Sequence, residues 1–180
     1  MLSLTLLAVL AAEPLVVVVP VEVMAPDGRI QALRLGLQSV LEADLKAAGV
    51  PVRTEDDLDA SHWGKIQGAT HVLICTVMNA GREVALAWRL VELPQEVVGT
   101  GRGAFLDRER VVKGVLTTLG RKAPAYTLLK VDLELAESWG EALATLKDGE
   151  PARARDQVAA VAKKWPAFTP AKERLQQLGP

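Results

Sequence analysis

Cysteine, histidine and aromatic residues are all scarce in this chain of 180 residues. The sequence has one cysteine, two histidines and only 4% aromatic residues. A single cysteine excludes an internal disulfide framework and a cysteine-rich metal site. His62 and His71 form neither an HExxH nor an HxH spacing, so no histidine metal centre is predicted. Cys75 lies in the apolar run HVLICTVM, which favours a buried structural thiol over a nucleophile.

The signatures of nucleotide binding and of hydrolysis are also missing. The turn MAPDGR has one glycine, no GxGxxG and no GK[ST], and Asp27 would repel a phosphate. Gly99, Gly101 and Gly103 alternate within VVGTGRGAF, and residues two apart on a strand share one face, which indicates close packing rather than a phosphate loop. No GxSxG elbow is present, and residues 55–59 lack the calcium-loop pattern. We therefore predict no catalytic residues, no cofactor and no metal: the protein is not an enzyme.

A strong excess of charge of one sign is absent as well. Lys and Arg total 21 and Asp and Glu total 22, for a net charge of −1. Binding to a polyanion needs a concentrated basic surface, so no nucleic-acid partner is predicted. The chain from Pro151 onward leans basic, but acidic residues are interspersed there, which is typical of a solvated face.

The N-terminal apolar run, Leu2 to Leu10, is too short to span a bilayer. It ends in the small residues Ala11 and Ala12, which is the shape of a secretory signal, so residues 1–12 are predicted to be a signal peptide. We expect a periplasmic protein with no transmembrane span after signal removal. The basic n-region is missing, because no Lys or Arg precedes Arg29. The alternatives are an N-terminal helix or strand, or a start site placed too far downstream, and the protein is then cytoplasmic.

Hydrophobic periodicity predicts an α/β (α+β) domain with a mixed sheet of about five strands in the order β-α-β-α-β-β-β-α. Pro20 should end or interrupt the first strand, and Gly49 should end the first long helix. Asp107 is placed to cap a later helix that Gly120 ends. The expected strands are 15–23, 50–54, 71–78, 84–93 and 97–105, and the expected helices are 30–48, 61–67 and 107–119.

Beyond Pro124 the pattern becomes helical and forms an appendage. Residues 125–147 keep helical spacing, although 129–135 also alternate as a strand would, and both readings stay open there. Two further helices are expected, with Pro151 in the first turn of one of them. The predicted organisation is an α/β domain over 13–122 and a helical tail over 123–180.

These segments together resemble a known family. VVVVPVEV, VLEADLKAAGVPVRTEDDL, GATHVLICTVMNAGREVALAWRLVELPQEVVGTGRGAF and RVVKGVLTTL are similar to the TolB N-terminal-like and CsgG-like domains of bacterial envelope proteins, over about Leu15 to Leu119. The tail, WGEALATLKDGEPARARDQVAAVAKKWPAFTPAKERL, resembles a single degenerate tetratricopeptide unit, with Gly149, Ala154 and Pro166 in the expected rhythm.

The resemblance implies a non-enzymatic envelope protein that acts as a protein–protein interaction or assembly module. Its partners would be other envelope proteins or a second copy of itself. In the tail, Trp139, Trp165 and Phe168 are the predicted partner-binding residues. The alternative function is a ligand-sensing regulatory domain, which would bind a small molecule or nucleotide in the crevice near Met24 to Arg29.

Overall fold

The computed structural model describes residues 14–24, 29–55, 68–80, 83–94, 96–104, 107–122 and 124–179. The predicted signal peptide, the turn at 25–28 and the short helix expected at 61–67 lie outside these residues. Among the helices within the described ranges, none combines the length and the hydrophobicity that a bilayer span requires.

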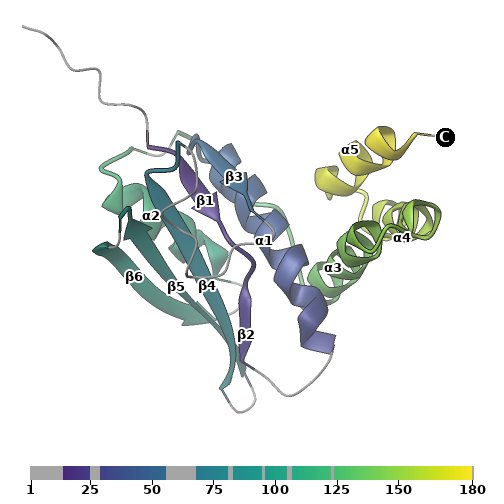
Figure 1. Ribbon diagram of the computed structural model, residues 1–180, viewed down its shortest axis with the longest axis horizontal. Helices are drawn as coiled ribbons and strands as arrows, with labels where there is room; N and C mark the ends of the chain where they lie inside the picture. Colours follow the sequence, from purple (N-terminus) through teal and green to yellow (C-terminus); the bar gives the residue numbers. More distant parts are fainter. Residues whose placement is uncertain are drawn as a thin grey trace, which may run out of the picture.

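Within the described residues the fold is a mixed six-stranded sheet with five helices, which confirms the predicted class (Figure 1). Five strands follow the order β3-β1-β4-β5-β6, and β2 pairs with β4 beyond the end of β1. Strand β1 is parallel to β3 and β4, whereas β4, β5 and β6 form an antiparallel meander. The strands are β1 (Val16–Val18), β2 (Glu22–Met24), β3 (Val52–Thr54), β4 (His71–Ala80), β5 (Glu83–Glu92) and β6 (Glu96–Ala104).

Pro20 explains why the structure has six strands rather than about five. The predicted first strand is divided into β1 and β2 on either side of this residue. Proline has no N–H to donate to a strand ladder, so regular pairing stops at it. Both halves nevertheless pair in parallel with β4, at Val16–Val18 and Glu22–Met24.

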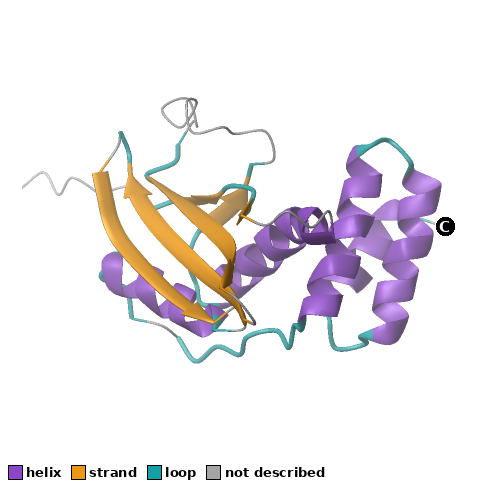
Figure 2. Ribbon diagram, turned by 90° about the horizontal axis from the view of Figure 1, so that it is seen from below, coloured by secondary structure: helices purple, strands orange, loops and turns teal. Residues whose placement is uncertain are grey.

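Helices α1 (Arg29–Ala47) and α2 (Arg108–Thr118) cover one face of the sheet (Figure 2). As predicted, α1 ends before Gly49, whose φ of 75° suits the left-handed residue that terminates a helix. Asp107 occupies the N-cap position of α2, but its side chain makes no capping hydrogen bond. The main core lies between these helices and the sheet, and it includes Leu37, Leu41, Leu73, Trp88 and Val112.

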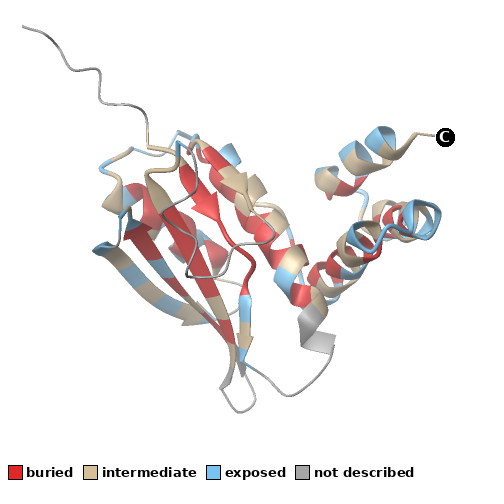
Figure 3. Cartoon of the chain, viewed as in Figure 1, coloured by how far each residue is buried: buried red, intermediate tan, exposed pale blue. Residues whose placement is uncertain are grey.

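Three further helices form the tail: α3 (Leu133–Lys147), α4 (Pro151–Lys164) and α5 (Thr169–Leu178). Helix α3 packs against α1 at nearly backbone-to-backbone distance. A Cβ on Gly140 would lie 1.6 Å from the carbonyl oxygen of Ala32, and one on Gly36 would lie 2.0 Å from that of Ala136. The buried side chains of α3 therefore continue the main core, and Figure 3 shows buried residues on both α1 and α3.

The start of α3 corrects the prediction for residues 125–147. The helix begins at Leu133, and residues 124–132 are neither helix nor strand. Asp132 caps α3, because its Oδ1 accepts a hydrogen bond of 2.7 Å from the Leu135 N–H. Upstream, backbone groups of Leu129 bond to side chains of α1 and α2, so they are not available for a helix ladder.

The alternating glycines of β6 pack closely, as predicted, and Gly99 and Gly101 both lie against a tryptophan. A Cβ on Gly101 would lie 2.4 Å from Nε1 of Trp88, and one on Gly114 would lie 2.1 Å from the same indole ring. Trp88 thus fills a slot between β6 and α2 that exists only because both residues lack a side chain.

Candidate functional site

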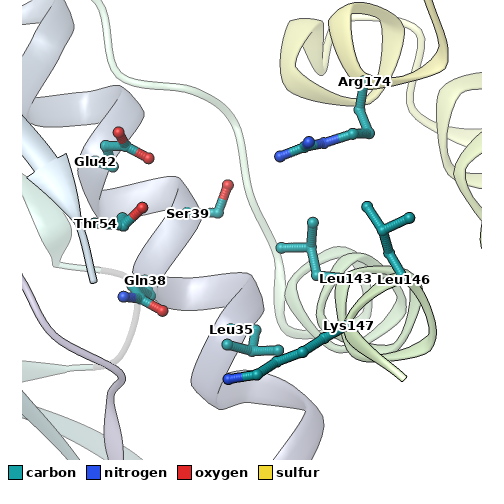
Figure 4. A pocket seen from close by; sticks show the side chains of 9 residues that line it. All are labelled: Leu35, Gln38, Ser39, Glu42, Thr54, Leu143, Leu146, Lys147 and Arg174. Carbon is teal, nitrogen blue, oxygen red and sulfur yellow. The ribbon is translucent and has the colours of Figure 1, made fainter. Parts of the chain in front are cut away.

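Two adjoining cavities lie between α1 and the helical tail, and together they form what we call the α1–tail groove; Figure 4 shows the larger one. Their volumes are about 270 and 160 Å³, and both are lined by Ser39, Glu42 and Arg174. The remaining lining residues of the larger cavity are Leu35, Gln38, Thr54, Leu143, Leu146 and Lys147. Those of the smaller cavity are Ala43, Lys46, Trp139, Pro170, Glu173 and Gln177.

The α1 side of the groove is held in place by hydrogen bonds. Gln38 is buried, and its Nε2 donates to the carbonyl oxygens of Val18 and Glu55 at 2.9 and 3.2 Å. Ser39 Oγ accepts a hydrogen bond of 3.1 Å from the indole Nε1 of Trp139. Glu42 pairs with Lys46 one turn later on the same helix, at 2.7 Å. This wall is therefore fixed to the sheet below it and to α3 beside it.

The tail side combines leucines with a cation. Leu143 and Leu146 of α3 face the larger cavity, and Arg174 reaches toward it from α5 (Figure 4). Within the part of the chain that the structure describes, the Arg174 guanidinium has no carboxylate partner and no hydrogen-bond acceptor. The groove thus presents an unmatched positive charge beside apolar surface.

Of the three aromatic residues predicted to bind a partner, only Trp139 lines the groove. Trp139 and Phe168 are 1% and 2% exposed, and their rings meet edge to face with centroids 5.4 Å apart. Both rings belong to the main core, and the assignment of these residues to partner binding stays a prediction. Trp165 is half-buried, with Lys164 Nζ 4.6 Å from its ring centroid, and it alone of the three keeps an accessible ring.

Cys75 and His71, the other residues with reactive side chains, lie in surroundings that suit a structural role. Cys75 is fully buried, and this burial raises the pKa of its thiol to about 12, so the thiolate nucleophile does not form near neutral pH. Burial lowers the pKa of His71, with an opposing effect from Glu92, and its Nδ1 lies 2.9 Å from Thr70 Oγ1. Over the described ranges, no group of three or more His, Cys, Asp or Glu is placed to hold a metal.

Asp44 and Arg108 form the only buried ion pair among the described residues. Each polar atom of the two side chains has a hydrogen-bond partner. Arg108 Nε donates to Asp44 Oδ2 at 2.7 Å, and its two other nitrogens donate to the carbonyl oxygens of Leu129 and Val131. Burial raises the pKa of Asp44, although Arg108 and the Leu129 N–H oppose this by favouring the carboxylate. The pair joins α1, α2 and the segment that leads into α3.

A third hollow, of about 460 Å³, lies beside α2 and is lined by residues 124–128 with Glu109 and Lys113. The latter two side chains are more than half exposed and pair with each other at 2.7 Å. This hydrogen bond raises the pKa of Lys113. Since its lining charges match each other, this hollow offers less for a ligand to recognise than the α1–tail groove does.

Sequence reasoning did not identify the groove. Its walls come from segments far apart in the chain, and Ser39 and Trp139, which bond across it, are separated by 100 residues. The predicted crevice near Met24 to Arg29 falls largely outside the described residues. The one sequence signal available for the groove was the helical spacing of Trp139 with Leu135 and Ala142, which marks Trp139 as a core residue.

Comparison with known proteins gives partial likenesses of fold. No protein-family model and no curated protein matches the chain. Among solved structures, a PelC dodecamer from Paraburkholderia phytofirmans is similar over 63% of this chain and 91% of its own, at 21% identity and a TM-score of 0.43. TolB from Acinetobacter baumannii is similar over 59% of this chain and 28% of its own, at 16% identity and a TM-score of 0.42. Lipoprotein GNA1162 from Neisseria meningitidis is similar over 59% of this chain and 96% of its own, at 19% identity and a TM-score of 0.39.

Proposed function

We propose that this protein is a non-enzymatic module of the bacterial cell envelope that binds a segment of a partner protein in the α1–tail groove. The observation that carries this proposal is the pair of adjoining cavities, whose lining combines leucine side chains with an unmatched arginine. Such a combination of apolar surface and one orienting charge is what a binding pocket for protein side chains requires.

The size of the cavities favours a polypeptide over a small-molecule ligand. At about 270 and 160 Å³, each is smaller than the roughly 300–1,000 Å³ of a typical small-molecule or cofactor pocket. Two such cavities side by side suit two neighbouring side chains of one peptide. This argument supports a polypeptide as the occupant of the groove.

A photo-crosslinking amino acid in the groove tests the binding function. Placed at Leu146, which lines the larger cavity, it should yield a discrete adduct with one protein in cells of the source organism. Glu141 is the matched control position, because it lies on the same helix but is exposed and lines neither cavity. Equal adducts from both positions, or none from Leu146, would contradict the proposal.

The location in the envelope rests on residues 1–12 and has its own test. We expect the full-length protein, expressed in a Gram-negative host, to lose about its first 12 residues and to be recovered from the periplasm. Intact mass spectrometry of the fractionated protein measures this. An uncleaved protein in the cytoplasmic fraction would remove the envelope from the proposal and leave the binding groove to be tested on its own.

A further inference from the structure

We infer that the groove takes a peptide in which a carboxylate side chain stands next to a leucine-type side chain. This inference rests on the proposed function and names the chemistry of its partner. It is carried by two hydrogen-bond donors that face the same space from opposite walls, the Arg174 guanidinium and the Ser39 hydroxyl (Figure 4).

The Ser39 hydroxyl is available as a donor because of its bond to Trp139. Its oxygen accepts the hydrogen bond from the indole Nε1, at 3.1 Å, and this uses a lone pair. A serine hydroxyl also has one O–H, which that contact leaves unused. Ser39 lines both cavities, so a group at their junction can accept from it.

Arg174 supplies the charge that selects an anion. Its guanidinium lines both cavities and has no carboxylate partner among the described residues. Of the acidic residues in the lining, Glu42 is paired with Lys46, and Glu173 is exposed and lines only the smaller cavity. A guanidinium offers a planar fork of N–H groups that fits a carboxylate in a bidentate manner.

The apolar half of the site lies immediately beside these donors. Leu35, Leu143 and Leu146 line the larger cavity together with Arg174, and all three leucines are only half-buried. A carboxylate at the shared junction therefore places the neighbouring side chain of the same peptide against leucine surface. Leucine, isoleucine or methionine fits that surface, whereas a second charge would lose its hydration there.

Selection from a displayed library of short random peptides, with the full-length protein as bait, tests this inference. We expect the selected peptides to be enriched in Asp or Glu beside Leu, Ile or Met. A synthetic peptide of the leading sequence should bind Arg174→Glu at least about tenfold more weakly, as the loss of a charge-assisted hydrogen bond implies. Replacing the acidic residue of that peptide by lysine should restore binding to this variant.

Lys172→Glu is the matched control for charge. Lys172 is exposed on the same helix and lines neither cavity, so the same change of charge there should leave the affinity nearly unchanged. One outcome would overturn this inference and leave the proposed function standing. In it, the selected peptides show no enrichment in acidic residues, yet they bind Leu143→Asp more weakly than the parent protein. Peptides that bind both groove variants like the parent protein, or a selection that yields none, would count against both. Circular dichroism of each variant verifies that it is folded.

Discussion

The side chains of Asp44 and Arg108 are 0% and 5% exposed, and they join α1, α2 and the segment that leads into α3. Asp44 also accepts from the Leu129 N–H at 3.3 Å, and Arg108 donates to two carbonyl oxygens of the segment before α3. A buried ion pair adds little stability relative to apolar residues of similar volume, but removal of one partner is strongly destabilising. The pair therefore fixes the path of the chain from α2 to α3.

Replacement of Arg108 by methionine should be strongly destabilising, because it leaves the Asp44 carboxylate buried without a cation. The expected loss in the free energy of unfolding is about 3–5 kcal/mol, measured by urea denaturation. The double variant Asp44→Leu/Arg108→Met should be more stable than this single variant, since no charge stays buried. If the two are equally unstable, the lost hydrogen bonds to Leu129 and Val131, rather than the charge, account for the effect.

Cys75 gives a second prediction at the residue scale. Since burial raises the pKa of this thiol to about 12, a thiol reagent at mildly alkaline pH should label the native protein only as fast as the molecule opens. Labelling should become immediate once urea unfolds the chain. Cys75 is the only cysteine, so intact mass spectrometry gives the labelled fraction directly from the proportion of protein that carries one adduct. Rapid labelling without denaturant would show that β4 is exposed in solution.

At the scale of elements, the crossing of α1 and α3 depends on the absence of two side chains. Gly140→Ala should therefore destabilise the protein even though alanine is the better helix former by about 1 kcal/mol. A Cβ at this position would lie 1.6 Å from the Ala32 carbonyl oxygen, which is backbone and cannot move without shifting α1. We expect a net loss of about 1–3 kcal/mol in the free energy of unfolding, the usual cost of overpacking.

Glu141→Ala is the control for the introduction of an alanine into α3, because Glu141 is the next residue of the helix and is exposed. It should change stability by less than about 0.5 kcal/mol, as surface substitutions do. Parallel urea titrations of the two variants make the comparison. A Gly140→Ala protein as stable as Glu141→Ala would mean that α1 and α3 lie farther apart than the structure places them.

The elements themselves were largely predictable where local chemistry decides them. Gly49 ends α1, Pro151 opens α4, and the period-two runs became β4, β5 and β6. The start of α3 was not predictable, because the backbone of residues 129–131 bonds to Asp44 and Arg108, which are distant in sequence. The groove escaped prediction for the same reason: Ser39 and Arg174 carry no motif, and only folding brings them to one cavity.

At the scale of the whole molecule, α1 belongs to both parts of the chain. One side of it covers the sheet through residues such as Leu37 and Leu41, and another side receives α3. The buried residues on the helix-covered face of the sheet and those of the tail therefore form one core, while a smaller cluster around Val72 and Ile74 lies apart from it. This continuity matters for the proposed function, because one wall of the groove is on α1 and the other on α3 and α5.

The core shared by sheet and tail predicts that the two unfold together. Fluorescence of a variant that keeps only Trp88 reports on the sheet, and that of a variant that keeps only Trp139 reports on the tail. In each variant we expect the fluorescence midpoint in urea to equal the midpoint that circular dichroism gives for the same variant. Cooperative unfolding gives the same midpoint for every probe. An earlier transition at Trp139 would show that the tail detaches while the sheet stays folded. The groove would then be a site that opens and closes with the tail, and its apparent affinity for a peptide would be proportional to the fraction of molecules in which the tail is docked on α1.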